Sequence, residues 1–220
     1  MTNIKICGIS TLNSYLHCAE NDVDYIGFVF FDKSPRHLDL DVAAQLADRA
    51  DDALKDKKQN APKRIALSVN ADNAMLEEII NHARPNILQL HGHESPERTN
   101  EIKQIFGLPV MPVIQVSNRA DIDAAAAYFS VADILLFDAA PECGAELPGG
   151  MGAQFDWNLM RDANIPIPWM LGGGLNSDNV AEAITLSGAD CVDVSSGVEK
   201  KRGEKSLSAI SRFVKSAKFG

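Results

Sequence analysis

The chain has 220 residues, of which 45% are hydrophobic and 23% are charged, and its formal net charge is −9. This length and composition predict a single globular domain over residues 1–220 with one large hydrophobic core. The acidic balance argues against a nucleic-acid partner, which needs a basic face. A small anion is not excluded, because a few oriented N–H groups can hold one.

Signals for a membrane span, for export and for metal binding are missing from the sequence pattern. No run approaches the ~18 apolar residues of a membrane span, and MTNIKICGIS lacks the charged-then-apolar layout of a signal peptide. The four cysteines lie far apart with no CxxC pair: Cys7, Cys18, Cys143 and Cys191. We therefore expect no disulfide framework, no metal site and a reducing, cytoplasmic location.

In the first third of the chain, apolar runs predict strands at 4–9, 25–30 and 64–69. An amphipathic helix is predicted between the first two strands by the i, i+3, i+4, i+7 spacing of Leu12, Tyr15, Leu16 and Ala19. The polar stretch 51–64 is expected to end a second helix and turn into the third strand, with its charges in solvent.

The middle of the chain continues the alternation of helices and strands. Pro85 is expected to end a helix that carries Met75, Leu76, Ile79 and Ile80. Strands are predicted at 87–92 and 109–116. The helix between them should have Ser95 as its N-cap, Pro96 in its first turn and Gly107 at its end.

The last third predicts strands at 134–139, 168–173 and 191–196. A weaker helical pattern precedes the final strand and comprises Val180, Ala183, Ile184 and Ser187. Eight strand signals that alternate with helices indicate a (β/α)8 barrel at the compact end of its size range. A doubly wound open sheet is the alternative that this pattern leaves open.

Strand alternation predicts which side chains face the barrel axis. In the first strand, the apolar Ile4 and Ile6 must face the helices, so Lys5 and Cys7 point inward. Cys7 then lies at the C-terminal end of its strand, where barrel active sites form. The same reasoning turns inward Gln89, His91, Asp138, Asp193 and Ser195.

Several polar side chains are therefore expected at one mouth of the barrel: Cys7, His91, Asp138, Asp193 and Ser195. A purely structural barrel would fill these positions with Val, Ile and Leu. Each polar residue alone is equally well explained as a structural group with its hydrogen bonds satisfied. Five of them together at strand ends favour a functional site.

Two glycine-rich segments follow the last two predicted strands, at 171–179 and 195–199. These are the loops that hold phosphate in phosphate-binding barrels, with help from a short extra helix. The candidate phosphate-binding residues are Gly172, Gly173, Gly174, Ser195, Ser196 and Gly197. A third glycine cluster contains Gly150 and Gly152, and either completes this cradle, acts as a lid or is a plain flexible loop.

The ordered motifs resemble those of the phosphoribosylanthranilate isomerase family of tryptophan biosynthesis over nearly the whole chain. They are KICGI, GFVF…KSPRH, QLHG, LLFDA, GGMG…FDW, LGGGLNSDNV and DVSSGVE. Two departures affect the third glycine loop. Met151 stands where the family usually has Thr or Ser, and the segment before it, with an insertion at 141–148, is longer.

The resemblance implies an Amadori rearrangement of a phosphorylated small molecule, N-(5-phosphoribosyl)anthranilate, with no cofactor. By motif match, Cys7 would be the general base, Asp138 the general acid, and Arg36 would face the anthranilate carboxylate. His91 and Asp193 are also expected in the substrate site, and His91 either bonds the substrate or orders the mouth.

The chemistry sets conditions on these side chains. Cysteine acts as a base only as thiolate, so we expect the pKa of Cys7 to lie below the usual value of about 8.5. Lys5, one layer below, would assist unless Asp193 neutralises it. Asp138 must carry a proton, which burial and nearby negative charges favour.

Three other readings of the barrel compete with this one. The related aminoaldose isomerases of histidine biosynthesis usually pair two aspartates, whereas Cys7 stands here. A decarboxylating indole-glycerol-phosphate synthase would need lysines at strand ends, and Lys5 lies too deep. A non-catalytic phospholigand-binding barrel would keep the glycine loops without needing Cys7 and Asp138. The sequence leaves a monomer and a homodimer equally open.

Overall fold

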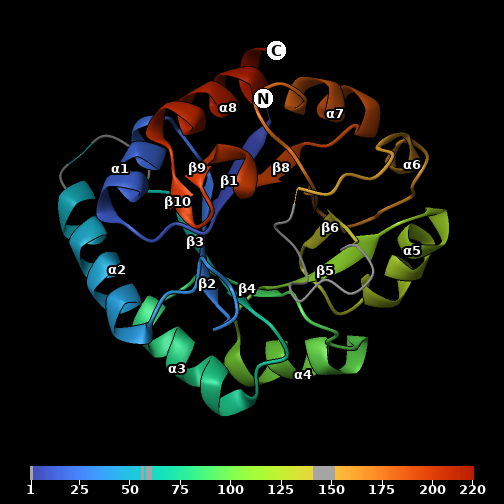
Figure 1. The fold of residues 1–220 in the computed structure, drawn as a ribbon. Helices are drawn as coiled ribbons and strands as arrows, with labels where there is room; N and C mark the ends of the chain where they lie inside the picture. Colours follow the sequence, from blue (N-terminus) through green and yellow to red (C-terminus); the bar gives the residue numbers. More distant parts are fainter. Residues whose placement is uncertain (1, 56, 58–60, 141–151) are drawn as a thin grey trace.

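The described residues of the chain form a closed barrel of eight strands. A computed structural model describes residues 2–55, 57, 61–140 and 152–220. The strands pair in chain order from β1 to β8, β8 returns to β1, and each neighbouring pair is parallel. Helices surround the strands (Figure 1). Closure confirms the predicted (β/α)8 barrel and shows that the open-sheet alternative is wrong.

Each strand prediction corresponds to an observed strand. The barrel strands are β1 (Asn3–Cys7), β2 (Tyr25–Phe30), β3 (Lys63–Ser68), β4 (Ile87–Leu90), β5 (Val110–Val116), β6 (Leu135–Ala139), β7 (Trp169–Leu171) and β8 (Cys191–Val194). The α-helices are α1 (Leu12–Glu20), α2 (Leu40–Leu54), α3 (Asn73–Ala83), α4 (Pro96–Phe106), α5 (Arg119–Ala124), α6 (Asn158–Arg161), α7 (Val180–Ser187) and α8 (Leu207–Phe219). Two short 3-10 helices are η1 (Ala125–Tyr128) and η2 (Ser196–Val198).

Helix ends follow the capping chemistry expected from the sequence. The Ser95 side chain accepts a hydrogen bond from the Arg98 N–H and caps α4, which ends at Gly107 in a left-handed conformation with φ of 65°. Helix α3 ends at Ala83, and its C-cap residue Arg84 directly precedes Pro85. These signals are local, so they could be predicted without knowledge of the fold.

Two separate apolar layers show that the predicted strand alternation is correct. Residues that face the helices, such as Ile4, Ile6 and Phe137, belong to the large core between barrel and helices. A smaller cluster fills the lower barrel interior and consists of Ile65, Ile87, Met111, Leu136, Met170 and Cys191. Above it, Cys7 packs with Val29 and Leu67. Cys7 therefore faces the barrel axis, at the C-terminal end of β1.

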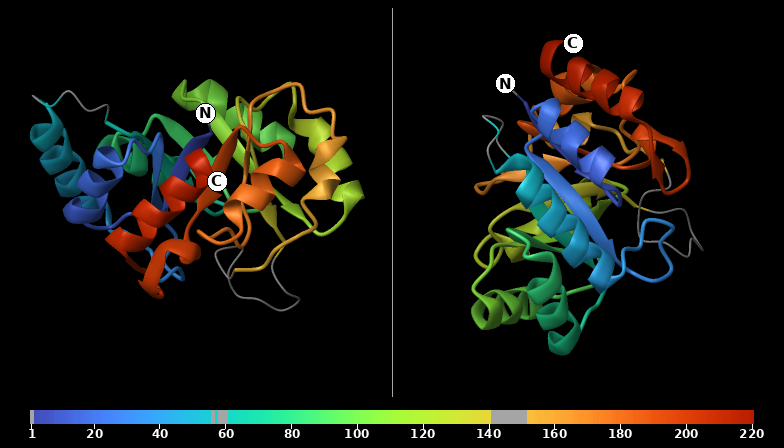
Figure 2. Two further views of the ribbon diagram at one scale, coloured as in Figure 1. Left: turned by 90° about the horizontal axis from the view of Figure 1, so that it is seen from above. Right: turned by 90° about the vertical axis from the view of Figure 1, so that its left-hand side faces the viewer.

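The sequence did not predict a small hairpin between η2 and α8. Its strands are β9 (Glu199–Lys201) and β10 (Glu204–Lys205), which pair antiparallel apart from the barrel sheet. Figure 2 shows the hairpin and the segment after β2 projecting on the same face of the molecule. Among the described residues, no helix has the length and apolar character needed to span a membrane.

Candidate active site

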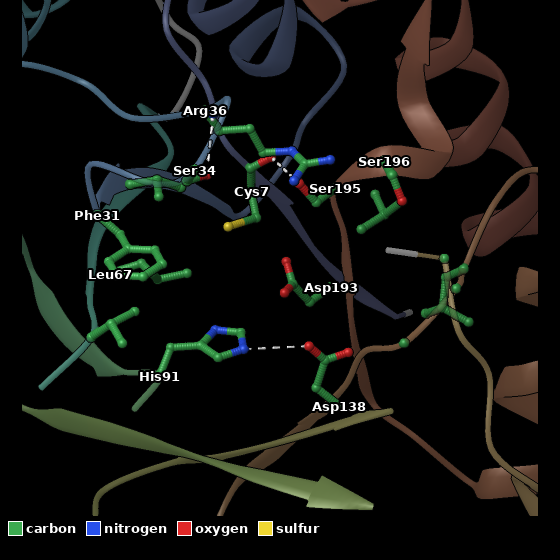
Figure 3. A pocket seen from close by; sticks show the side chains of 17 residues that line it. Cys7, Phe31, Ser34, Arg36, Leu67, His91, Asp138, Asp193, Ser195 and Ser196 are labelled. Carbon is green, nitrogen blue, oxygen red and sulfur yellow. Dashed lines mark hydrogen bonds and ion pairs between the residues drawn. The ribbon is translucent and has the colours of Figure 1, made fainter. Parts of the chain in front are cut away.

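An open cavity of about 690 Å³ lies at the carboxyl ends of the barrel strands. Its lining includes the five polar residues that strand alternation turned inward: Cys7, His91, Asp138, Asp193 and Ser195. Arg36, from the segment after β2, joins them (Figure 3). The structure thus brings the predicted residues together at one mouth.

Beneath Cys7 lies a buried ion pair between β1 and β8. Lys5 is fully buried, and its Nζ lies 2.9 Å from Oδ1 of Asp193. The two residues are register partners across β1 and β8, which fixes their proximity. Burial lowers the pKa of Lys5, but the negative charges of Asp193 and Cys7 outweigh it, so the pKa lies above its ordinary 10.5. Lys5 is therefore a permanent cation under the thiol.

The thiol itself departs from expectation. Cys7 is only 5% exposed, and burial raises its pKa above the ordinary range of a cysteine thiol. The Lys5 charge acts in the opposite direction, but Asp193 adds its own negative charge close by. The prediction of a lowered thiol pKa is therefore wrong, because desolvation of the thiol exceeds the effect of a cation that Asp193 already pairs.

Asp138, at the end of β6, is held from two sides. Its Oδ1 accepts a hydrogen bond from the Ala139 N–H at 3.0 Å, and its Oδ2 lies 3.5 Å from Nε2 of His91. The buried Gln89 amide donates to Nδ1 of His91 at 3.0 Å, which assigns the imidazole proton to Nε2. His91 therefore turns Nε2 toward Asp138, and whether it bonds the substrate or orders the mouth stays a prediction.

Arg36 is buried rather than an ordinary surface arginine. Its side chain is 5% exposed, and its Nε donates to Glu199 at 2.7 Å while its Nη2 donates to the other carboxylate oxygen at 3.0 Å. A methyl group at Gly8, where φ is +82°, would come within 2.8 Å of the Arg36 Cδ. Because Gly8 has no side chain, the aliphatic part of the Arg36 side chain can pack there, beside the cavity.

The glycine-rich loops after β7 and β8 supply another side of the cavity. The lining residues from these loops and from the segment before α6 include Gly152, Gly173, Gly174, Ser195 and Ser196. The Ser195 hydroxyl donates to the Cys7 carbonyl at 3.1 Å and so ties the β8 loop to β1.

The remaining glycine candidates stand apart from this lining. Gly172 and Gly197 are not among the lining residues, and a side chain at Gly197 would collide with the Leu175 carbonyl, where the two loops meet. Gly150, Met151 and the insertion at 141–148 lie outside the described residues. A phosphate-binding role for any of these residues stays a prediction.

Sequence reasoning missed an apolar wall and the residues behind Arg36. Val29, Phe31, Leu67 and Val69 line the cavity from the ends of β2 and β3. The rule that oriented β1 places the apolar set of a strand against the helices, so it gave no signal that the apolar Val29 and Leu67 face the cavity. No sequence signal paired Glu199 with Arg36.

A thiol and a carboxyl group that face each other across a barrel mouth are typical of an enzyme that moves protons. Within the described residues, no group of three His, Cys, Asp or Glu side chains is placed to hold a metal ion. The fold and site together define a (β/α)8-barrel enzyme of the acid–base type.

Comparison with known proteins gives the family. Residues 4–216 match the family model described as N-(5'phosphoribosyl)anthranilate (PRA) isomerase. The chain is 47% identical to the N-(5'-phosphoribosyl)anthranilate isomerase of Rhodopseudomonas palustris (strain BisB18), over 98% of this chain and 95% of the relative. It therefore belongs to the N-(5'-phosphoribosyl)anthranilate isomerase family.

Solved structures agree with this assignment. The phosphoribosyl anthranilate isomerase of Thermotoga maritima has a TM-score of 0.85 and 31% identity, with 99% of each chain covered. A phosphoribosyl anthranilate isomerase in complex with reduced 1-(o-carboxyphenylamino)-1-deoxyribulose 5-phosphate has a TM-score of 0.82 and 30% identity, with the same coverage.

Proposed function

We propose that this chain, as a single barrel domain and without a cofactor, catalyses a step of tryptophan biosynthesis. The step is the Amadori rearrangement of N-(5-phosphoribosyl)anthranilate to 1-(2-carboxyphenylamino)-1-deoxyribulose 5-phosphate. The observation that carries the proposal is the placement of Cys7 and Asp138 on opposite sides of a cavity that Arg36 also lines (Figure 3). Family membership and the analogue-bound relative support it.

The cavity offers a distinct environment for each end of this substrate. The apolar side chains of Phe31 and Leu67 lie across the cavity from Ser195 and Ser196 (Figure 3). The aromatic ring fits the apolar side, and a guanidinium such as that of Arg36 matches a carboxylate. Backbone N–H groups of the glycine loops suit the phosphate. The ribose then lies between Cys7 and Asp138.

The proposed reaction moves two protons in sequence. Protonated Asp138 donates to the ribose ring oxygen, the C1–O bond breaks, and the nitrogen lone pair forms the C1=N bond of a Schiff base. The Cys7 thiolate then removes the C2 proton, the C2–H electron pair forms a C1=C2 bond, and the nitrogen regains its lone pair. Protonation at C1 and loss of the C2 hydroxyl proton give the ketone. A positioned acid or base contributes about 10²- to 10⁴-fold each.

Loss of substrate fluorescence under steady-state conditions tests the proposal. Cys7→Ser and Asp138→Asn should each lower kcat by about 10²- to 10⁴-fold. Cys18→Ser is the matched control, because Cys18 is buried in the core between barrel and helices and should retain turnover. Normal turnover by both site variants would exclude Cys7 and Asp138 as the base and the acid, whereas absence of turnover by the wild type would leave the phospholigand-binding barrel. The aminoaldose of histidine biosynthesis should not be converted, since the Cys7–Asp138 pair differs from two aspartates.

Two further expectations belong to this proposal. We propose a cytoplasmic location, which the free thiols of Cys7, Cys18 and Cys191 support. The active unit is proposed to be a monomer or a homodimer, which sedimentation velocity distinguishes by mass.

A further inference from the structure

The β9–β10 hairpin packs against the segment that carries Arg36. Its turn contains Gly203, whose N–H donates to Oε2 of Glu199 at 3.1 Å. A side chain at Gly203, where φ is +84°, would collide with the carbonyl oxygen of Pro35. The hairpin turn therefore touches the residue that precedes Arg36, and the hairpin strand β9 delivers Glu199 to the arginine.

Glu199 is shared between two buried cations. The carboxylate side chain is 4% exposed and accepts both hydrogen bonds of the Arg36 fork. It also accepts a bond at 2.8 Å from Nζ of Lys205, whose side chain is 2% exposed. A bidentate pair of this kind fixes the plane of a guanidinium as well as its position. We call these three residues the Arg36–Glu199–Lys205 cluster.

We propose that Glu199 is a positioning residue for substrate binding, which holds the Arg36 guanidinium in the orientation that receives the anthranilate carboxylate. The inference rests on the proposed function, which places that carboxylate at Arg36. Glu199 is not among the residues that line the cavity, so it acts through Arg36 rather than on the substrate.

Lys205 explains how a paired arginine still attracts an anion. With Lys205 protonated, one carboxylate against two cations gives the Arg36–Glu199–Lys205 cluster a net positive charge at the wall of the site. Burial lowers the pKa of Lys205 below its ordinary 10.5, and the charge of Glu199 opposes that effect. Although burial raises the pKa of Glu199, its bonds to Arg36 and Lys205 bring it down to about 2, so the carboxylate stays charged near neutral pH. Lys205 also donates to the Ser195 carbonyl at 2.9 Å, which connects the cluster to the β8 loop.

The experiment compares substrates with and without the carboxylate. N-(5-phosphoribosyl)anthranilate and N-(5-phosphoribosyl)aniline are assayed with wild type, Glu199→Gln and the matched control Glu204→Gln. Glu204 lies on the same hairpin but pairs with the surface residues Lys200 and Lys201. For Glu199→Gln we expect KM for the anthranilate substrate to rise about tenfold or more, with kcat little changed. KM for the aniline substrate should match that of the wild type, and Glu204→Gln should alter neither.

A second variant separates the effect of the Arg36 orientation from the effect of the net charge of the cluster. Glu199→Gln combined with Lys205→Met restores the net charge of the cluster but not the carboxylate that holds Arg36. It should keep the raised KM for the anthranilate substrate. If instead it recovers the wild-type KM, or if Glu199→Gln raises KM equally for both substrates, the positioning role is overturned.

Failure of the proposed function has a different signature. In that case the wild type itself does not convert the anthranilate substrate. Circular dichroism confirms folding of each variant. If Glu199→Gln alone does not fold, the double variant Glu199→Gln with Lys205→Met is assayed in its place. The positioning role then requires its KM to be raised for the anthranilate substrate and not for the aniline substrate.

Discussion

Replacing Lys5 by Met removes one charge from the buried pair under the Cys7 thiol. Lys5 is fully buried, its Nζ lies 2.9 Å from Asp193, and the Asp193 side chain is only 12% exposed. Methionine fills a similar volume but leaves the carboxylate without its cation. Breaking a buried pair from one side costs about 3–5 kcal/mol of unfolding free energy. For a chain of this size, that loss corresponds to a fall in Tm of roughly 6–20 °C.

The ion pair of Lys103 provides a control of the same length that is more exposed to solvent. The Lys103 Nζ also lies 2.9 Å from a carboxylate, that of Asp133, but both side chains are about one-third exposed. Exposed pairs contribute about 0–1 kcal/mol, so Lys103→Met should change stability by no more than that. Urea unfolding of the two variants therefore isolates the effect of burial at constant ion-pair length.

A double-mutant cycle and a thiol titration complete the test. In Lys5→Met with Asp193→Asn no charge is left unpaired, so the loss should fall short of the sum of the single losses by about 1–3 kcal/mol. The pKa of Cys7 should rise in Lys5→Met, because the Lys5 charge lowers it, and the pH dependence of thiol alkylation reports this shift. A destabilisation no larger than that of Lys103→Met, or an unchanged thiol pKa, would refute the reasoning.

Three more outcomes are expected. Burial raises the pKa of Cys7, so kcat/KM should climb through the alkaline range as the thiolate forms; a plateau already reached below pH 7 contradicts this. Glu199 titrates at about 2 instead of 4.5, so roughly 3 kcal/mol of stability should be present above pH 4.5 and lost as the pH falls toward 2. Urea unfolding of Glu199→Gln should vary less across that window, and equal slopes argue against the assignment. His91→Gln should lower kcat about 10- to 100-fold with little change in KM; an unaltered kcat shows that the Nε2 contact with Asp138 is dispensable.

The parts of this site that could be predicted are those fixed by local sequence patterns. Side-chain alternation along a strand placed Cys7, Asp138 and Asp193 at the barrel mouth, because a strand has only two faces and the apolar residues occupy one. Lys5 and Asp193 then meet because β1 pairs with β8, which follows once eight strands close into a barrel. Each step uses a period or a topology that the sequence itself displays.

The parts that could not be predicted depend on contacts between distant segments. Arg36 and Glu199 are 163 residues apart in the chain, and their pairing needs the hairpin to fold over the segment after β2. The hairpin strands have three and two residues, too few for a visible alternation. The thiol pKa was predicted in the wrong direction because the sequence shows that Lys5 lies near Cys7, but not how fully the thiol is buried.

These same contacts explain how a chain with a net charge of −9 is suited to a substrate with two anionic groups, a carboxylate and a phosphate. In two ion-paired groups beside the mouth, three buried cations pair with two carboxylates: Lys5 with Asp193, and Arg36 and Lys205 with Glu199. Asp138 adds a further buried carboxyl group across the mouth. The carboxylates make it possible to bury the cations and fix their direction, while the excess positive charge remains beside the cavity. Because charges separated by more than about 10 Å are largely screened at ordinary ionic strength, the acidic outer surface opposes the substrate weakly. We therefore expect the orientation of a few buried groups, rather than the net charge of the chain, to decide which anion this barrel accepts.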